Sequence, residues 1–251
     1  MSARVEGAVA FVTGANRGIG RAFVEQLLEG GAARIYAGMR DGAATDLADR
    51  DGRIHPVSLD VTDRSQVEAA ATACGDVDLL INNAGYHART RLVLTDDPDA
   101  ARREMEVNYF GVLNMTRAFA PILGGNGGGA IVNVLSVAGA MPSPFMGGYS
   151  PAKSAALFLS TISRAELEPQ GTTVTALIVG SVDTRMADHV VGPKENPSDI
   201  ARVGLAAMER GERVTDTDQR ALRARAMYAL DPARYERAQA KILHATTLRT
   251  T

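Results

Sequence analysis

The sequence is poor in cysteine and carries almost no charge imbalance, and these two absences exclude several kinds of protein. Its one cysteine, Cys74, cannot form a disulfide within the chain, and no group of cysteines and histidines has the spacing of metal ligands. The formal net charge of -2 gives no electrostatic attraction to nucleic acid or to an anionic membrane. We therefore expect no bound metal, no nucleic-acid partner and a reduced, cytoplasmic environment.

Long apolar runs are missing as well. Residues 1–7 contain Glu6 where a signal peptide needs its apolar core, and no stretch reaches the roughly 18 uninterrupted apolar residues of a membrane span. We expect a soluble protein that has no membrane partner.

The sequence does contain a regular alternation of short apolar runs with longer helical stretches. The runs that are typical of buried strands are 8–12, 33–37, 54–59, 77–81, 130–135 and 174–179. This alternation predicts an α/β fold, a doubly wound Rossmann-type parallel sheet in the order 3-2-1-4-5-6 with helices on both faces. The 251 residues suit one such domain, 1–251, and no linker divides them.

Two segments near the C-terminus leave this alternation. Residues 210–216 could form a short seventh strand, and the charged residues 217–244 indicate a helical extension.

Tyr149 is followed four residues later by Lys153, and Ser136 lies thirteen residues before the tyrosine. A tyrosine phenol has a reference pKa of about 10, and a cation one helical turn away favours its ionised form. Residues i and i+4 share a helix face, so Lys153 supplies that cation. The pair alone is common on solvated helix faces, and the rest of the pattern therefore decides its meaning.

A glycine loop follows the first predicted strand and reads Thr-Gly-Ala-Asn-Arg-Gly-Ile-Gly over residues 13–20. Gly14, Gly18 and Gly20 leave room for a pyrophosphate near the backbone, and the helix from about Ile19 offers free N–H groups to phosphate oxygens. Together with the serine, tyrosine and lysine, this loop resembles the classical short-chain dehydrogenase/reductase family. The resemblance covers about residues 5–190, in the family's order and spacing.

The resemblance implies an oxidoreductase with the catalytic residues Asn108, Ser136, Tyr149 and Lys153. Tyr149 would exchange the proton, and the Ser136 hydroxyl would polarise the carbonyl oxygen. Lys153 would lower the phenol pKa and hold the nicotinamide ribose. The Asn108 side chain would bind a water that feeds protons to Lys153, although a buried structural amide is the alternative for Asn108 taken alone.

The resemblance also implies NADP(H) as the cofactor. NAD enzymes of this fold hold the ribose 2'-hydroxyl with an acidic residue after strand two, where this chain has Met39. Arg40 follows Met39, and Arg17 lies in the glycine loop, so two guanidiniums can bind a 2'-phosphate. The alternative is that both arginines are ordinary surface charges and Asp41 takes the ribose.

Further cofactor contacts follow from the same motifs. Asp60 resembles the residue that contacts adenine, with a helix N-cap as its competing role. Thr184 is expected to bind the carboxamide. The full set of expected cofactor contacts is Gly14, Asn16, Arg17, Gly18, Ile19, Gly20, Arg40, Asp60, Val61, Asn83, Ala84, Gly85, Tyr149, Lys153, Gly180, Val182 and Thr184.

Mostly apolar residues are expected around the nicotinamide, which favours a hydrophobic ketone or aldehyde and its alcohol as the small-molecule substrate. They are Tyr86, His87, Arg89, Met141, Phe145, Met146, Met186, His189, Val190 and Val191. Residues 185–197 contain two prolines and no sustained helical period, which predicts a mobile substrate lid.

The assembly and the activity each leave an alternative open. We expect a homodimer, and a tetramer or a monomer remains possible because the C-terminal segment departs from the family's usual ending. The alternative to an enzyme is a non-catalytic NADP-binding sensor or scaffold on the same fold, since fold does not fix function.

Overall fold

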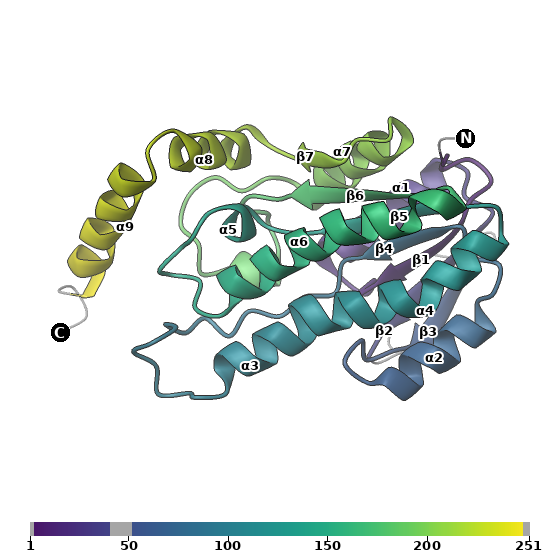
Figure 1. Cartoon of the computed structure of the whole chain (residues 1–251), viewed down its shortest axis with the longest axis horizontal. Helices are drawn as coiled ribbons and strands as arrows, with labels where there is room; N and C mark the ends of the chain where they lie inside the picture. Colours follow the sequence, from purple (N-terminus) through teal and green to yellow (C-terminus); the bar gives the residue numbers. More distant parts are fainter. Residues whose placement is uncertain (1–2, 41–51, 248–251) are drawn as a thin grey trace.

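The computed structural model describes residues 3–40 and 52–247, which form one parallel sheet with helices on both faces (Figure 1). Its strands are β1 Val9–Thr13, β2 Arg34–Met39, β3 Ile54–Ser58, β4 Leu79–Asn82, β5 Gly129–Val134, β6 Thr172–Ile178 and β7 Val214–Asp216. Its helices are α1 Gly18–Glu29, α2 Arg64–Ala73, α3 Ala100–Met105, α4 Gly111–Gly125, α5 Val137–Ala140, α6 Tyr149–Leu167, α7 Pro197–Glu209, α8 Gln219–Leu230 and α9 Pro232–Thr247. Three further helical turns are the π-helix η1 Glu106–Phe110 and the 3-10 helices η2 Glu168–Gln170 and η3 Arg185–Ala187.

The strand order is β3-β2-β1-β4-β5-β6-β7, which confirms the predicted order and places the seventh strand at the edge. The six longer strands begin and end within two residues of the predicted runs. The chain reverses its direction of travel across the sheet between β1 and β4. In sheets of this kind, ligands bind outside the carboxyl ends of the strands at that point.

Alternate side chains of the central strands pack into two separate hydrophobic cores, one on each face of the sheet. In β1, Ala10 and Val12 pack with α1 and α7, whereas Phe11 packs with α2 and α4 on the opposite face. All three side chains are fully buried. Because both faces of β1 are covered, its sequence has no polar alternation, and this explains the continuous apolar run seen in the sequence.

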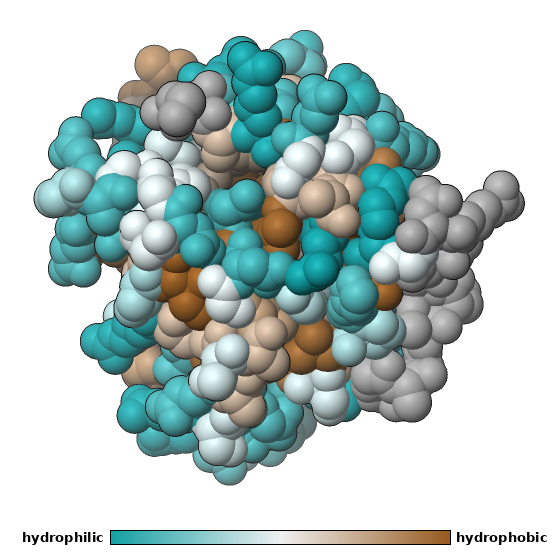
Figure 2. All heavy atoms as spheres, turned by 90° about the vertical axis from the view of Figure 1, so that its right-hand side faces the viewer, coloured by the Kyte–Doolittle hydropathy of each residue, from teal (hydrophilic) through white to brown (hydrophobic). Residues whose placement is uncertain are grey.

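The C-terminal segment is helical as expected, but it is broken into two helices. Pro232 cannot donate a helical N–H, and α8 ends at Leu230 before α9 begins at Pro232. In Figure 1, α8 and α9 form an arm at the left, beside the carboxyl ends of the strands. Figure 2 shows the opposite end, where the surface is mainly hydrophilic and apolar residues form small patches. The carboxyl ends of β1 and β4, where the strand order reverses, are the expected ligand-binding edge.

Candidate active site

The glycine loop lies at the carboxyl end of β1 and packs tightly against the residues after β4. A Cβ atom on Gly20 would lie 2.2 Å from the Gly14 carbonyl oxygen and 2.4 Å from Asn83 Nδ2. Asn83 Nδ2 donates to the Thr13 carbonyl oxygen at 2.9 Å, and the Thr13 hydroxyl accepts from the N–H groups of Asn83 and Ala84. Gly14 has a φ of 65°, which favours glycine. Side chains at these glycines would break the contact.

Helix α1 begins at Gly18, in agreement with the sequence. Its N-cap residue is Arg17, whose side chain makes no capping hydrogen bond. The first N–H groups of a helix have no partner within it, so they remain available to an anion. Asn16 and Arg17 are exposed, while Ile19 packs against the core. A Cβ on Gly18 would lie 3.1 Å from Thr184 Cγ2, so the segment after β6 closes on the glycine loop.

Asp218 connects that segment to the C-terminal arm. The Gly180 N–H donates to Asp218 Oδ2 at 2.9 Å, and a Cβ on Gly180 would lie 2.8 Å from both carboxylate oxygens. Asp218 is also the N-cap of α8. The nearby Val182 is buried and forms an isolated bridge with Glu195. Sequence reasoning missed Asp218, because its partner Gly180 lies 38 residues away.

The two arginines expected to bind a 2'-phosphate are both exposed. Arg40 follows directly on Met39, which ends β2 and is buried. The Ala15 N–H donates to the Gly38 carbonyl oxygen at 3.1 Å and so fixes the glycine loop beside the end of β2. The alternative ribose ligand, Asp41, lies outside the described residues.

Asp60 does not cap the helix that follows it. Its Oδ1 accepts from the Thr62 N–H and hydroxyl, whereas Asp63 is the N-cap of α2. The N-cap alternative for Asp60 is therefore wrong, and its adenine contact stays a prediction. Val61 is buried, and a Cβ on Gly111 would lie 2.6 Å from its Cγ2.

Ser136, Tyr149 and Lys153 come together at the carboxyl end of β5. Ser136 is the N-cap of α5, and Tyr149 begins α6, where the Ser136 hydroxyl acts to lower the phenol pKa. Lys153 Nζ lies 5.7 Å from the centroid of the Tyr149 ring and donates to the Val134 carbonyl oxygen at 2.9 Å. The spacing in the sequence thus produces one cluster, with two hydroxyls and one ammonium.

Burial is the largest influence on the pKa of the Tyr149 phenol and on that of the Lys153 ammonium. It raises the pKa of Tyr149 to about 12, against the opposing effect of the Ser136 hydrogen bond, and the charge of Glu104 raises this pKa further. It lowers the pKa of Lys153 to about 8. The net pKa of the phenol is thus raised because burial disfavours its charged form, and the lowering of this pKa by Lys153 stays a prediction.

Asn108 lies in η1, a π-helical turn between α3 and α4, and is fully buried. Its Nδ2 donates to the carbonyl oxygens of Tyr86 at 2.7 Å and Glu104 at 2.9 Å, and its Oδ1 accepts from the Tyr86 N–H. A Cβ on Gly85 would lie 3.1 Å from this Oδ1 and 3.8 Å from Lys153 Nζ. Both amide hydrogens thus hold the backbone, so these contacts match the structural alternative and give no support to the expected water-binding role.

Two further residues that sequence reasoning missed support this cluster. The Ser150 hydroxyl donates to the Ala138 carbonyl oxygen and accepts from the Ser143 N–H at 3.3 Å, which ties the serine segment to the first turn of α6. Glu104 Oε1 accepts from the Ala88 N–H at 2.8 Å. Ser150 stands beside Tyr149 in the sequence, but Ser150 and Glu104 are both outside the pattern of Ser136, Tyr149 and Lys153.

Residues 185–191 contact the segment after β4 through Arg89. Its guanidinium donates to the carbonyl oxygens of Arg185 at 2.8 Å and Met186 at 3.1 Å, and it pairs with Asp188 at 2.7 Å. Arg89 has a φ of 60°, the left-handed region that residues with a side chain seldom adopt. Arg89 thus joins the expected lid segment to the residues after β4, and the closing of this segment over a substrate stays a prediction.

His87 lies between Tyr149 and this lid. Its ring centroid is 5.1 Å from that of Tyr149 and 6.0 Å from that of His189. Burial lowers the pKa of His87 to about 4, so its imidazole is neutral at pH 7. A neutral ring packed on the phenol is consistent with the expectation that the tyrosine, and not His87, handles the proton.

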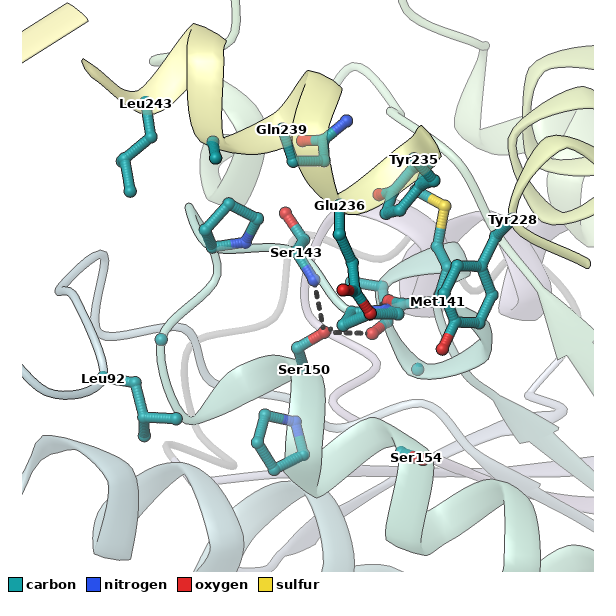
Figure 3. A pocket seen from close by; sticks show the side chains of 17 residues that line it. Leu92, Met141, Ser143, Ser150, Ser154, Tyr228, Tyr235, Glu236, Gln239 and Leu243 are labelled. Atoms are coloured by element: carbon teal, nitrogen blue, oxygen red, sulfur yellow. Dashed lines mark hydrogen bonds between the residues drawn. The ribbon is translucent and has the colours of Figure 1, made fainter. Parts of the chain in front are cut away.

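A cavity of about 640 Å³ separates the segment between Ser136 and Tyr149 from the C-terminal arm (Figure 3). Met141 lines it together with Tyr228 and Tyr235 of the arm, and Ser150 lies on the opposite wall. Of the residues expected around the nicotinamide, Met141 faces this cavity, whereas Phe145 and Met186 are each 37% exposed and Val191 is 99% exposed. The lid therefore leaves apolar side chains at the surface.

Within residues 3–40 and 52–247, no group of three or more His, Cys, Asp or Glu side chains could hold a metal ion. In the same part of the chain, no helix combines the length and the apolar character needed to cross a bilayer.

Comparison with known proteins identifies the family. The model of the family described as short chain dehydrogenase matches residues 8–194. Oxidoreductase BOA17 of Botryotinia fuckeliana is 36% identical over 70% of this chain and 66% of its own length. Short chain dehydrogenase tazN of Aspergillus terreus is 34% identical over 77% of this chain and 44% of its own length. The chain thus spans less than two thirds of these two curated relatives.

Among solved structures, a short chain dehydrogenase from Burkholderia cenocepacia in complex with NADP is 41% identical. The two chains superimpose with a TM-score of 0.87 over 97% of this chain and 98% of the other. With its sheet order, glycine loop and Ser136–Tyr149–Lys153 cluster, this chain belongs to the short-chain dehydrogenase family.

Proposed function

We propose that this oxidoreductase uses NADP(H) to interconvert a carbonyl compound and its alcohol, with Tyr149 as the general acid and base. The observation that carries the proposal is the cluster at the carboxyl end of β5, where Lys153 Nζ lies 5.7 Å from the centroid of the Tyr149 ring and the Ser136 hydroxyl acts on the phenol pKa. Because the two hydroxyls lie together, a carbonyl oxygen beside them could accept hydrogen bonds from both.

The protein's own groups suit the reducing direction. Tyr149 is protonated at neutral pH, since its pKa is raised to about 12, and it can therefore donate a proton to the developing alkoxide. Ser136 stabilises the same oxygen by a hydrogen bond. The phenolate that remains would lie beside Lys153, whose ammonium compensates its charge and can restore the proton.

The residues present fit a dinucleotide. The glycine loop has no room for side chains at Gly14 and Gly20, and the start of α1 offers N–H groups to a phosphate. Lys153 would hold the nicotinamide ribose. When bound, the cofactor supplies the hydride for the carbonyl carbon.

A preference for NADP(H) over NAD(H) rests on Arg17 and Arg40. Both are exposed beside the glycine loop and the end of β2, where the acidic residue of NAD enzymes is replaced by the buried Met39. Two guanidiniums match the geometry and charge of a 2'-phosphate. The Burkholderia cenocepacia relative, which was solved with NADP, supports the same choice.

A hydrophobic ketone or aldehyde is the substrate class that the surroundings favour. His87 is neutral, and Met186 and Val191 expose apolar surface on the lid. Closing apolar side chains over a substrate of the same kind removes both from water. Arg89 is already engaged with the lid, so it is not free to receive an anionic substrate.

The proposed assembly is a homodimer in the cytoplasm. On the outer face of α6, Phe158 is 69% exposed and Ile162 is 56% exposed, and a second copy would cover both. The cytoplasmic environment is supported by the single cysteine, Cys74.

The test is a panel of carbonyl compounds followed by the absorbance of NADPH, with NADPH and NADH titrated in parallel. We expect apolar carbonyl compounds to give higher kcat/KM values than sugars or keto acids, and NADPH to exceed NADH. NADPH binding without turnover of any compound would favour a sensor or scaffold. A carboxylated substrate that wins by more than about a hundredfold would refute the substrate class.

A further inference from the structure

Glu104 is a fully buried carboxylate on α3 that the mechanism above does not use. A buried charge is costly unless other groups compensate it. The adjacent Arg103 does not do so directly, because its guanidinium pairs with Asp97 at the surface. Glu104 Oε1 accepts from the Ala88 N–H at 2.8 Å, so one oxygen holds the segment that follows β4.

The other oxygen faces the first turn of α6. A Cβ on Gly148 would lie 2.8 Å from Glu104 Oε2 and 2.6 Å from Ala101 Cβ, so only glycine permits this approach immediately before Tyr149. Oε2 makes no hydrogen bond of normal geometry. Burial raises the pKa of Glu104, but the N–H groups of Ala88, Gly148 and Tyr149 oppose that rise. The positive end of a helix dipole also favours an anion at this point.

Several elements present polar or titratable groups around the Tyr149 ring. They are Ser136, Lys153, His87, the lid residue His189 beyond it, and Glu104. Ser136 donates or accepts a hydrogen bond and carries no charge, and His87 is neutral at pH 7. Two charged groups therefore lie close to Tyr149: the ammonium of Lys153, which is beside the ring, and the carboxylate of Glu104, which is beside the first turn of α6.

These two charges act in opposite directions. A cation favours the phenolate, whereas a carboxylate in a poorly solvated site disfavours a second negative charge nearby. The approach of Glu104 to the first turn of α6 thus gives Tyr149 an electrostatic environment that the Tyr-x-x-x-Lys pattern alone does not predict.

We propose that Glu104 is a positioning residue that holds the segment after β4 and the first turn of α6 around Tyr149, and that its negative charge keeps the phenol protonated. The proposal rests on the proposed function, in which Tyr149 is the acid. A protonated phenol is the form that carbonyl reduction consumes, and alcohol oxidation requires the phenolate. Glu104 would therefore bias the site toward reduction at a given pH.

The test compares Glu104→Gln with Glu106→Gln, a control that removes an exposed carboxylate two residues further along the chain. The ionisation of Tyr149 is followed by the ultraviolet absorbance of tyrosinate, with and without NADP⁺, as the difference between each protein and its Tyr149→Phe counterpart. We expect Glu104→Gln to move the midpoint to lower pH by roughly half a unit or more. Glu106→Gln should leave it in place. An unmoved midpoint in Glu104→Gln, or the same shift in both variants, would overturn the proposal.

A second variant covers the case in which Glu104→Gln is too unstable to titrate. The glutamine NH₂ group would face backbone N–H groups, which is unfavourable. Glu104→Met instead removes the charge and buries an apolar side chain of similar length. The same downward shift is expected in Glu104→Met.

Kinetics provide the independent readout. In Glu104→Gln, the rise of kcat/KM for alcohol oxidation should move to lower pH by the same amount as the midpoint of the titration. Equal losses of both directions at an unchanged pH midpoint would show a structural role only. If the wild type turns over no carbonyl compound, the proposed function fails, while the tyrosinate titration still decides the role of Glu104.

Discussion

Arg89 contacts residues 185–188 of the expected lid, and replacing it should release this segment without unfolding the protein. Two substitutions separate the side chain from the backbone. Arg89→Ala removes the contacts to Arg185, Met186 and Asp188 but keeps a side chain at a φ of 60°. Arg89→Gly removes the same contacts and also relieves the strained backbone.

The free energy with which Arg89 holds the lid can be estimated from the exposure of the side chains in contact. The Arg89 and Asp188 side chains are 40% and 57% exposed, so their ion pair contributes little. The two hydrogen bonds to the lid carbonyl oxygens contribute about 0.5 to 1 kcal/mol each. Their total of about 1 to 2 kcal/mol corresponds to a roughly 5- to 30-fold increase in lid opening. Glycine should recover about 1 kcal/mol of overall stability relative to alanine, because the left-handed backbone conformation then has no steric cost.

Hydrogen exchange of residues 185–191 tests the contacts of Arg89 with the lid, and the thermal midpoint Tm tests the argument from the backbone. Exchange should rise by a similar factor in Arg89→Ala and Arg89→Gly, whereas Tm should fall further in the alanine variant. Adding NADPH and an inhibitor should restore protection if the lid orders over both ligands. Unchanged exchange in both variants would refute the role of Arg89, and equal Tm values would refute the argument from the backbone.

Four further outcomes are expected. Arg40→Asp should shift the ratio of kcat/KM values from NADPH toward NADH by at least about tenfold, and a wild type that already prefers NADH would contradict the 2'-phosphate assignment. Tyr149→Phe should abolish turnover but retain NADPH binding by fluorescence titration; turnover near the wild-type rate would point to another acid. Gly20→Ala should weaken NADPH binding at least about tenfold, because its Cβ would lie 2.2 Å from the Gly14 carbonyl oxygen; an unchanged Kd would show that the loop can relax. His87 has its pKa lowered from 6.5 to about 4, so its neutral form stabilises the fold above pH 6.5 and this contribution is lost as the pH falls toward 4. Allowing for partial exposure, the loss should be about 1 to 2 kcal/mol, and chemical denaturation across this range should show a smaller loss in His87→Phe; parallel curves would contradict the burial argument.

The sheet and the glycine loop could be predicted because their signals are local. Buried strands appear as short apolar runs, and the order of those runs, together with the handedness of the connections, determines the strand order. Gly14 and Gly20 occur where a helix follows a strand. A Cβ atom at either position would lie too close to Asn83 or to the backbone of the loop, so both positions require glycine. Boundaries of strands were harder, since they depend on the pairing partner: β2 continues to Met39 because Met39 pairs with Ser58 of β3.

The environment of Tyr149 could not be predicted from the same pattern. The spacing to Lys153 indicates a nearby cation, but the pKa of the phenol depends on burial, and burial is produced by residues distant in the sequence. Glu104 lies 45 positions before Tyr149 and belongs to another helix. Asn108 shows the same limit, since its hydrogen bonds to Tyr86 arise only when η1 packs against the end of β4.

Asp218 has a consequence for how the C-terminal region can diversify. The family match ends at residue 194, whereas this carboxylate, beyond that limit, takes the N–H of Gly180 and caps α8. The exposed positions of α8 and α9 can therefore change in charge or apolar content while the Asp218 junction to Gly180, inside the family match, stays intact. A chimaera that exchanges the two terminal helices at this aspartate should keep its nucleotide selectivity and acquire the donor's range of substrates.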